Sequence, residues 1–490
     1  AEAGVAFVQA EIQSLDLTSQ TLQLKGRLPL PFTLLSLDVG AISRPVAANR
    51  LPPAGSLVPI KPLEPALACL DRQDGTSPDP FHVVGSGLAG VEVALALRHR
   101  WPRRPIHLLA RIDRLDRRFG KALREAEVHV DYQPADARAT TVATNSAGLL
   151  CSGSRAPDWL AASGLPCCQG SGRVLTNNQL QVIDHPNIFA SGDCGLIDTD
   201  RRPPSGVWAV RAAIPLARNL EAACQNQPLR PWTPQRKALQ LLGGFQGDRL
   251  TAWALWGSLM LGPQPLLWRW KQCIDRRFMQ RFQASTMSRA EASADSDRML
   301  CRGCAAKLPA ATLEAALTSA GVGGLATAPE DAALVPTKET GPRAPLLQSV
   351  DGFPALISDP WLNGRITALH ACSDLWACGA SVQSAQAVVT LPLTSPRIQQ
   401  DLLAQTIAGI RSALDPQQAK LIGGHTLEER NPAPNPSSLG LQLVLSVHGS
   451  PLRDFWPKRG LQAGDQLLLS RPLGTGVLFA AAMAGAAAPE

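Results

Sequence analysis

A glycine-rich turn between an apolar strand and an apolar helix constrains the fold of this chain more than any other feature. The turn, residues 85–90, has the sequence Gly-Ser-Gly-Leu-Ala-Gly; it follows the apolar run Phe81–Val84 and precedes the apolar run Val91–Leu97. A further run, Ile106–Leu109, completes a strand–helix–strand order, which favours a βαβ unit. Glycines at this spacing let the backbone approach a pyrophosphate at the amino end of the helix. The pattern predicts a dinucleotide site that contains Gly85, Gly87 and Gly90.

The residues after the second strand bear on which nucleotide would bind. A carboxylate at this place would hold the ribose hydroxyls of NADH, whereas an arginine would favour the 2′-phosphate of NADPH. The chain has Ala110 and Arg111 here, with Asp113 just beyond, so NADH and NADPH both stay open. Glu92, near the start of the helix, also has two interpretations: a side chain that faces the nicotinamide, or a first-turn acid favoured by the helix dipole.

Other motifs flank the glycine turn. The apolar strand Ile188–Ala190 ends in Ser191-Gly192-Asp193, Leu37-Asp38-Val39-Gly40 lies upstream, and Gly148–Gly153 follows the turn's domain. In this order the motifs resemble those of the two-dinucleotide-fold flavoproteins, most closely the type II NADH dehydrogenases. The resemblance implies FAD and NAD(P)H as cofactors, with Gly192 and Asp193 at the ribityl chain of FAD. The family's first FAD motif has no counterpart here, so we expect the chain to be a fragment, cut at both ends.

Residues 251–283 combine tryptophans with arginines and lysines. Gly262, Pro263 and Pro265 interrupt the apolar run, which argues against a transmembrane helix. Two interpretations remain: a helix pair that packs on its own domain, and an amphipathic segment that lies at a membrane surface. Residues 284–297 are mostly small, polar and charged, as is typical of a linker.

A cysteine and a lysine after this linker indicate a catalytic site. Lys307 lies three residues after Cys304, in a segment made flexible by Gly303. A lysine near a thiol raises the thiolate fraction, and the same ammonium can neutralise a polyphosphate. We therefore predict Cys304 and Lys307 as catalytic residues, with Lys307 also at ATP. Cys301 and Cys304 have C-x-x-C spacing, but a structural zinc site needs four ligands and no second usable pair exists.

From Met299 onward the motifs resemble those of the selenide, water dikinases. The Cys304/Lys307 pair is followed by Glu330-Asp331-Ala332-Ala333, Ser349-Val350-Asp351, a helix with Ser373-Asp374, a glycine-rich turn at Gly423-Gly424-His425, and Gly464–Gly476. The resemblance implies Asp331 and Asp374 as Mg²⁺ ligands, and it implies that ATP contacts Asp351, Gly423, Gly424 and His425. Hard oxygen ligands around a triphosphate suit Mg²⁺. His370 stands where the family usually has asparagine, so its role stays open.

These motifs predict a multidomain α/β and α+β chain. A two-dinucleotide-binding-domain flavoprotein that lacks its first FAD motif would precede an aminoimidazole-ribonucleotide-synthetase-like ATP-binding α+β domain. The predicted parts are a partial FAD-binding domain (1–76), an NAD(P)H-binding domain (77–147), the second part of the FAD-binding domain (148–220), a carboxy-terminal flavoprotein segment (221–283), the linker (284–297), the dikinase amino-terminal domain (298–450) and the start of its carboxy-terminal domain (451–490).

The function that follows is selenophosphate synthesis from selenide, ATP and water, with AMP and phosphate as the other products, fused to an FAD-dependent NAD(P)H oxidoreductase. One alternative is a membrane-surface NAD(P)H:quinone oxidoreductase with a regulatory nucleotide-binding module. Another is a related ATP-using ligase, which the Cys304/Lys307 pair argues against. The resemblance also implies a homodimer that takes small-molecule substrates.

The amino-acid composition indicates the cellular environment and the kinds of partner. The chain has eleven cysteines, an odd number, without a regular framework or a signal peptide, which favours a reducing, cytoplasmic environment. Contact with the inner face of a membrane stays an open addition. The formal charge of +7 comes from scattered residues, and no nucleic-acid-binding motif is present, so we predict no nucleic-acid partner.

Overall fold

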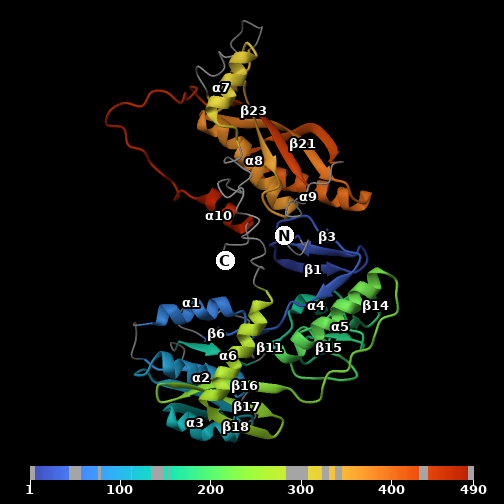
Figure 1. The fold of residues 1–490 in the computed structure, drawn as a ribbon, viewed down its shortest axis with the longest axis vertical. Helices are drawn as coiled ribbons and strands as arrows, with labels where there is room; N and C mark the ends of the chain where they lie inside the picture. Colours follow the sequence, from blue (N-terminus) through green and yellow to red (C-terminus); the bar gives the residue numbers. More distant parts are fainter. Residues whose placement is uncertain are drawn as a thin grey trace. The chain divides into compact units, whose positions relative to one another are not determined.

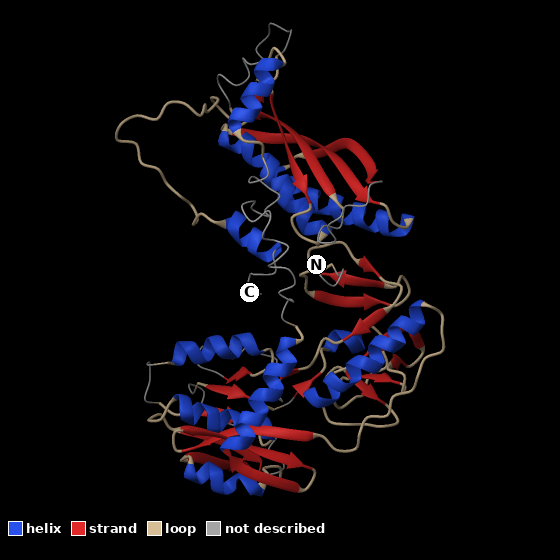
Figure 2. Ribbon diagram, in the orientation of Figure 1, coloured by secondary structure: helices blue, strands red, loops and turns tan. Residues whose placement is uncertain are grey.

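The helices and strands of this chain form two compact units (Figure 1; Figure 2). The computed structural model describes residues 6–43, 57–74, 79–111, 113–133, 147–152, 154–282, 307–322, 330–336, 345–429 and 440–483. Unit 1 comprises Ala1–Ile12, Gln23–Leu30 and Ala284–Glu490, and unit 2 comprises Gln13–Leu22 and Pro31–Gln283. The division of the chain into seven parts, given above, stays a prediction. It differs from the two units because it places residues 1–12 and 23–30 in the FAD-binding domain, whereas they belong to unit 1 with the carboxy-terminal region.

The glycine turn lies in a parallel sheet of unit 2. In spatial order its strands are β6 (Leu57–Pro59), β10 (Gly148–Leu150), β7 (Phe81–Val84), β8 (Ile106–Arg111) and β9 (Val128–Gln133). Its helices are α1 (Leu63–Gln73), α2 (Leu88–Arg100), α3 (Gly120–Glu125) and the 3₁₀ turn η1 (Arg117–Phe119). The turn joins β7 to α2, and β8 pairs in parallel with β7. The predicted βαβ unit is therefore confirmed.

A second, mixed sheet carries the predicted flavin motif. Its strands, in order, are β15 (Gly195–Ile197), β12 (Val174–Thr176), β13 (Gln181–Val182), β14 (His185–Ala190) and β4 (Leu35–Leu37). Helix α5 (Gly206–Cys224) packs on it through Ala212 and Leu216, which share a buried cluster with Phe189 and Ile197. The remaining small elements are β5 (Ile42–Ser43), β11 (Ser154–Arg155) and α4 (Asp158–Ala162). Strands β4 and β14 run parallel, so their motifs meet at one sheet edge.

Residues 251–283 do not form a helix pair, so that interpretation was wrong for the first half of the segment. They contribute to the antiparallel sheet β16 (Leu239–Gln246), β17 (Arg249–Trp256) and β18 (Leu259–Gln264), followed by α6 (Pro265–Gln280). Residues 249–256 pair with β16 along their whole length, and the buried residues Thr251, Ala252, Trp253 and Leu255 lie within this strand. Gly257, with φ of 62°, makes the turn that separates β17 from β18.

Unit 1 is built on a five-stranded sheet with helices on one face. The strands, in order, are β19 (Ala333–Leu334), β20 (Leu347–Pro354), β23 (Gln442–Pro451), β21 (Ala380–Pro392) and β22 (Lys420–Glu429). Its other elements are α7 (Ala310–Ser319), α8 (Pro360–Ala377), α9 (Pro396–Leu414), the 3₁₀ turn η5 (Asp415–Gln417) and α10 (Thr475–Met483). In β23, Leu443, Leu445 and Val447 are buried in the cluster that α8 and α9 complete, so one face of the sheet is covered by helices.

Helices α8 and α9 approach each other through glycines. A Cβ atom on Gly409 would lie 1.9 Å from the carbonyl oxygen of Trp361, and one on Gly364 would lie 2.4 Å from that of Thr406. Any larger residue at either position would force the helices apart, because these neighbours are backbone atoms. This close packing fixes the position of α8, which carries His370 and Asp374.

An amino-terminal arm, defined as residues 6–12 and 23–30, is part of unit 1. It belongs to the small sheet β1 (Ile12–Asp16), β2 (Thr21–Leu24) and β3 (Leu30–Pro31). Arg27 forms a bidentate ion pair with Asp359, at 2.6 and 2.7 Å, and the two side chains are only 6% and 4% exposed. The Arg27 guanidinium also lies 4.6 Å from the ring centroid of Trp361. Asp359 caps α8 as well, because it accepts hydrogen bonds from the backbone N–H groups of Trp361 and Leu362.

Candidate functional site

Two polar contacts join β20 to α8 in unit 1. The Ser349 hydroxyl donates to Asp374 Oδ2 at 2.5 Å, and His370 Nε2 lies 2.9 Å from Asp351 Oδ2. Residues 349 and 351 are about 6.8 Å apart along the strand, and residues 370 and 374 are about 6.0 Å apart along the helix. Because these spacings are nearly equal, Ser349 can face Asp374 while Asp351 faces His370. His370 and Asp374 are four residues apart on α8 and share a helix face, and His370 contacts Asp351 of β20. This contact could not be predicted from the sequence, because Asp351 lies on another element, β20.

Lys307 also lies at this row of side chains. Its ammonium is 3.8 Å from Asp351 Oδ2 and is 66% exposed, whereas the Asp351 side chain is 12% exposed. The structure thus brings together Lys307, Asp351 and His370, three of the residues singled out in the sequence. Asp351 lies inside β20, three residues before the strand ends at Pro354. Cys304 lies outside the described residues, so its predicted role stays a prediction.

Asp331 lies beside a cation from the chain itself. Lys458 Nζ is 2.7 Å from Asp331 Oδ1, and the Lys458 backbone N–H donates to Glu330 at 3.0 Å. The Asp331 hydrogen bond, followed by the charges of Asp331, Glu330 and Asp374, raises the pKa of Lys458. The two predicted Mg²⁺ ligands, Asp331 and Asp374, therefore act on the same ammonium. Lys458 could not be predicted as part of this site, because no recognisable motif surrounds it.

The donor set at this place fits a magnesium ion. Asp331 and Asp374 offer oxygen ligands, and Asp331 already balances a positive charge, that of Lys458. Mg²⁺ is commonly held by one or two carboxylates together with substrate phosphates rather than by a full protein cage. Among the residues that the structure describes, no group of three or more His, Cys, Asp or Glu side chains is arranged to hold a metal ion.

Gly423, Gly424 and His425 lie in strand β22, not in a turn after a strand as predicted. Gly424 permits the close pairing with β21, because a Cβ there would lie 1.9 Å from the Ala387 oxygen. The register places His425 in the row of Val388 and Val444, on the face that the helices leave open. Asp351 shares its row with Leu445, which is buried under the helices. The structure therefore does not bring His425 together with Asp351, and its place at ATP stays a prediction.

The glycine turn in unit 2 has the geometry that a close backbone approach requires. A Cβ on Gly90 would lie 2.2 Å from the Gly85 oxygen, and Gly87 stands at the N-cap of α2. The N-terminal N–H groups of a helix are suited to a pyrophosphate. Ser86 Oγ accepts a hydrogen bond of 2.7 Å from the backbone N–H of Arg111, the last residue of β8. The turn and the end of the second strand are thus held together.

Glu92 is engaged by backbone from another element. Its Oε1 accepts a hydrogen bond of 2.8 Å from the N–H of Gly243 in β16. This contact ties α2 to the antiparallel sheet, and it supplies a structural reason for an acid at this position. The predicted contact with nicotinamide is not tested by this geometry and stays a prediction.

The flavin motif residues meet at the ends of β4 and β14. The Gly192 position is tight against Asp38, because a Cβ there would lie 2.1 Å from Asp38 Oδ1. Burial, and secondarily the charge of Asp193, raises the pKa of Asp38. Asp193 in turn pairs with Lys61 at 2.7 Å. The structure therefore brings Asp38 and Lys61 to Gly192 and Asp193, the two residues for which the resemblance implied a contact with FAD. Two acids with one ammonium fit a polar chain such as the ribityl group of FAD.

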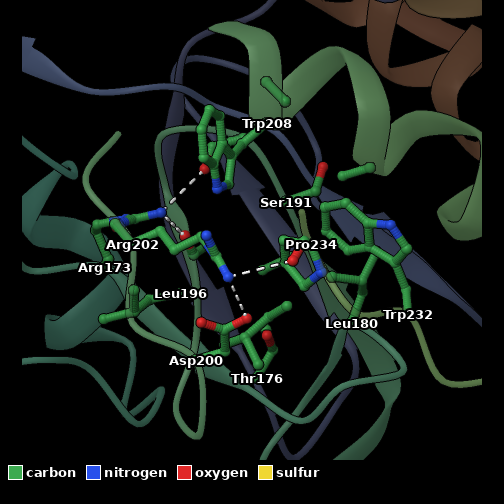
Figure 3. Close-up of a pocket in the computed structure, with 16 residues that line it drawn as sticks. Arg173, Thr176, Leu180, Ser191, Leu196, Asp200, Arg202, Trp208, Trp232 and Pro234 are labelled. Carbon is green, nitrogen blue, oxygen red and sulfur yellow. Dashed lines mark hydrogen bonds and ion pairs between the residues drawn. The ribbon is translucent and has the colours of Figure 1, made fainter. Parts of the chain in front are cut away.

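A small cavity of about 40 Å³ lies next to this motif, between β12, β15 and α5 (Figure 3). Arg173 and Arg202 line it side by side, with Trp208 on one side and Asp200 and Thr176 on the other. The Arg173 guanidinium donates to the carbonyls of Arg202, Gly192 and Gly195, so it fixes the loop that carries Asp193. Burial lowers the pKa of Arg173. Its position beside a short strand gave no sequence signal for this role.

Helix α6 has two sides of different character. Leu266, Trp270 and Ile274 recur every fourth residue and are all exposed. Arginines and lysines occupy other positions of the same helix. Among the described residues, no helix combines the length and the apolar composition that crossing a bilayer would require.

Comparison with known proteins places the carboxy-terminal part. Residues 329–442 match the family "AIR synthase related protein, N-terminal domain". The selenide, water dikinase of Nitratidesulfovibrio vulgaris is 35% identical over 157 residues, which is 32% of this chain and 41% of that protein. That of Myxococcus xanthus is 31% identical over 198 residues, 39% of this chain and 52% of that protein. The chain thus spans about half or less of the length of these relatives.

One solved structure is similar over a larger share of this chain than the two dikinases are. The sulfide:quinone oxidoreductase from the hyperthermophilic bacterium Aquifex aeolicus has a TM-score of 0.43 at 12% identity, covering 60% of this chain and 79% of that one. Residues 329–442 carry the N-terminal domain of AIR synthase related proteins, in a carboxy-terminal part similar in sequence to selenide, water dikinases.

Proposed function

We propose that the carboxy-terminal part makes selenophosphate from selenide, ATP and water, releasing AMP and phosphate, and that the amino-terminal part is an FAD-dependent NAD(P)H oxidoreductase. The observation that carries the first proposal is the row of Ser349–Asp374 and Asp351–His370 contacts with Lys307 beside it. This row lies in the domain whose sequence relatives are selenide, water dikinases.

The residues of the row have separate roles in this proposal. Lys307, exposed and next to Asp351, binds the polyphosphate of ATP. Cys304, three residues earlier in the sequence, supplies the thiolate. Asp331 and Asp374 hold Mg²⁺, which when bound neutralises charge on the phosphate oxygens. Ser349 keeps Asp374 in place through its hydroxyl, and His370 does the same for Asp351.

In the amino-terminal part, Gly85, Gly87 and Gly90 receive the nicotinamide nucleotide, and Gly192 and Asp193 contact FAD. Bound FAD would supply hydride-transfer chemistry at this place. Asp38 and Lys61 set the charge around Asp193. Arg173 holds the loop after β14 by its bonds to the carbonyls of Gly192 and Gly195.

Phosphorus NMR tests the dikinase proposal. The full-length protein is incubated anaerobically with ATP, Mg²⁺ and selenide, and a Cys304→Ala variant is run beside it. We expect signals of selenophosphate and AMP that disappear in the variant. ATP turnover without selenophosphate would instead point to a related ligase, and no turnover of ATP would contradict the proposal.

A second candidate function is a membrane-surface NAD(P)H:quinone oxidoreductase with a regulatory nucleotide-binding module. The exposed apolar residues of α6, with basic residues on the same helix, favour it, because such a helix lies well at a lipid surface. Quinone reduction that needs added anionic vesicles, in a protein that forms no selenophosphate, would favour this function over the first.

We also propose a homodimer formed through the sheet of unit 1. The face that the helices leave open exposes apolar side chains of four strands: Val350, Val388, Ile422, Leu427 and Val444. Contiguous exposed apolar surface of this kind marks association sites. Sedimentation is expected to give a dimer that Val444→Lys converts to monomer, while Leu313→Lys on α7 leaves it intact; a monomeric parent protein would contradict the proposal.

A further inference from the structure

The carboxyl end of β8 carries arginine where a ribose-binding acid would stand. Arg111 is the last residue of β8, and its backbone N–H is bonded to Ser86 in the glycine turn. In a βαβ nucleotide fold, the adenosine ribose lies at the end of this second strand. The Arg111 side chain is therefore placed where the 2′-position of the ribose would lie.

Asp113, the carboxylate that follows β8 in the sequence, forms ion pairs with two arginines, Arg111 and Arg114. Asp113 accepts two hydrogen bonds from Arg111, at 3.1 and 2.9 Å, and Arg114 Nε lies 3.4 Å from the same carboxylate. The backbone N–H of Arg114 donates to the Arg111 carbonyl at 3.1 Å, and this turn brings the second guanidinium back. The hydrogen bond from Arg111 holds the pKa of Asp113 below its ordinary value. The Asp113 carboxylate is thus paired with both arginines before a nucleotide binds.

The net charge of Arg111, Asp113 and Arg114 favours the binding of an anion at the end of β8. Two guanidiniums and one carboxylate leave a net charge of +1. The Arg111 and Arg114 side chains are 41% and 69% exposed, so both can reach a ligand. A phosphate monoester carries about −1.5 to −2 charges at pH 7, and the guanidinium fork matches its oxygens. A ribose hydroxyl could accept hydrogen bonds from the two guanidiniums, but neutral–charged contacts of this kind are weaker than those to a phosphate.

We infer that the βαβ unit of this protein selects NADPH over NADH, with Arg111 and Arg114 holding the 2′-phosphate. Asp113 keeps both guanidiniums at the strand end before the nucleotide binds. The inference rests on the proposed nicotinamide site at Gly85, Gly87 and Gly90, and it names the nucleotide that this site takes.

Titration calorimetry on the full chain tests the inference without relying on turnover. The probes are 2′,5′-ADP against 5′-AMP, and NADPH against NADH. We expect the 2′-phosphorylated member of each pair to bind at least about tenfold more tightly, since one charge-assisted contact to phosphate is worth roughly that factor. Equal or tighter binding of NADH would overturn the inference and leave the nicotinamide site standing. Binding of none of the four probes would overturn both.

Variants locate the selectivity. Arg111→Ala is expected to weaken NADPH binding roughly 10- to 100-fold and to change NADH binding by less than about threefold. Arg118→Ala is a matched control, because Arg118 pairs with Asp116 in the same manner but also donates to the Ser258 carbonyl at 3.0 Å. An equal loss for NADPH and NADH in Arg111→Ala, or an equal loss of NADPH affinity in both variants, would contradict the assignment.

Discussion

Arg27→Met is expected to lower the free energy of unfolding of unit 1 by about 3–5 kcal/mol, because it leaves the Asp359 carboxylate buried without its cation. The ion pair is bidentate and nearly inaccessible to solvent. Asp359 would still cap α8, but an unpaired buried charge is costly. Hydrogen exchange of the α8 amides in the full chain measures the loss where it arises.

A neighbouring ion pair supplies the control. Lys25 and Glu11 belong to the same arm and lie 2.9 Å apart, but their side chains are 63% and 67% exposed. Lys25→Ala should therefore cost less than about 1 kcal/mol. Replacing both buried partners, as Arg27→Met with Asp359→Leu, should recover part of the loss, since no lone charge remains. Equal effects of Arg27→Met and Lys25→Ala would contradict the importance of burial.

Asp374→Asn is expected to reduce selenophosphate formation roughly 10²- to 10³-fold, the usual effect of removing one preorganised charged group from a transition state. The amide keeps the shape of the side chain and its contact with Ser349. What it loses is the negative charge that a magnesium ion requires. The rate should be recovered in part at higher Mg²⁺ concentration, which initial rates over a Mg²⁺ series would measure.

Two further variants serve as comparisons: Ser349→Ala should have an intermediate effect, and Asp415→Asn is the control. Ser349→Ala removes only the hydroxyl that orients Asp374, so its effect should lie between those of the parent and of Asp374→Asn. Asp415 forms a surface pair with Arg411 on α9 and η5, and Asp415→Asn should leave the rate unchanged. A rate for Asp374→Asn close to that of the parent would remove Asp374 from the proposed metal site.

The sequence predicted those features of the fold that depend on neighbours along the chain. The β7–turn–α2–β8 order followed from apolar runs and glycine spacing, and the structure confirms it. The common helix face of His370 and Asp374 followed from a spacing of four residues. The approach of Asp38 to Gly192 and Asp193 was not predicted, because residues far apart in sequence meet there through the parallel pairing of β4 with β14.

Features that depend on pairing between distant strands were missed. Gly423 and Gly424 indicate a turn when read locally, yet they permit the close pairing of β22 with β21. The role of His370 stayed open, and its contact with Asp351 joins α8 to β20, a pairing that spacing along the chain does not predict. Trp253 was interpreted as part of a helix, but it packs in a strand over Gly244, which leaves room for its ring. Tertiary contacts decided each case.

The contact between Arg27 and Asp359 also has a consequence for the time at which unit 1 completes its fold. The two residues are 332 positions apart. At a synthesis rate of about 5–20 residues per second, Arg27 leaves the ribosome roughly 17–66 s before its partner. Throughout that interval its guanidinium is best left in water, because burial without the carboxylate would be unfavourable. The amino-terminal arm is therefore the first part of unit 1 to be made and among the last to dock.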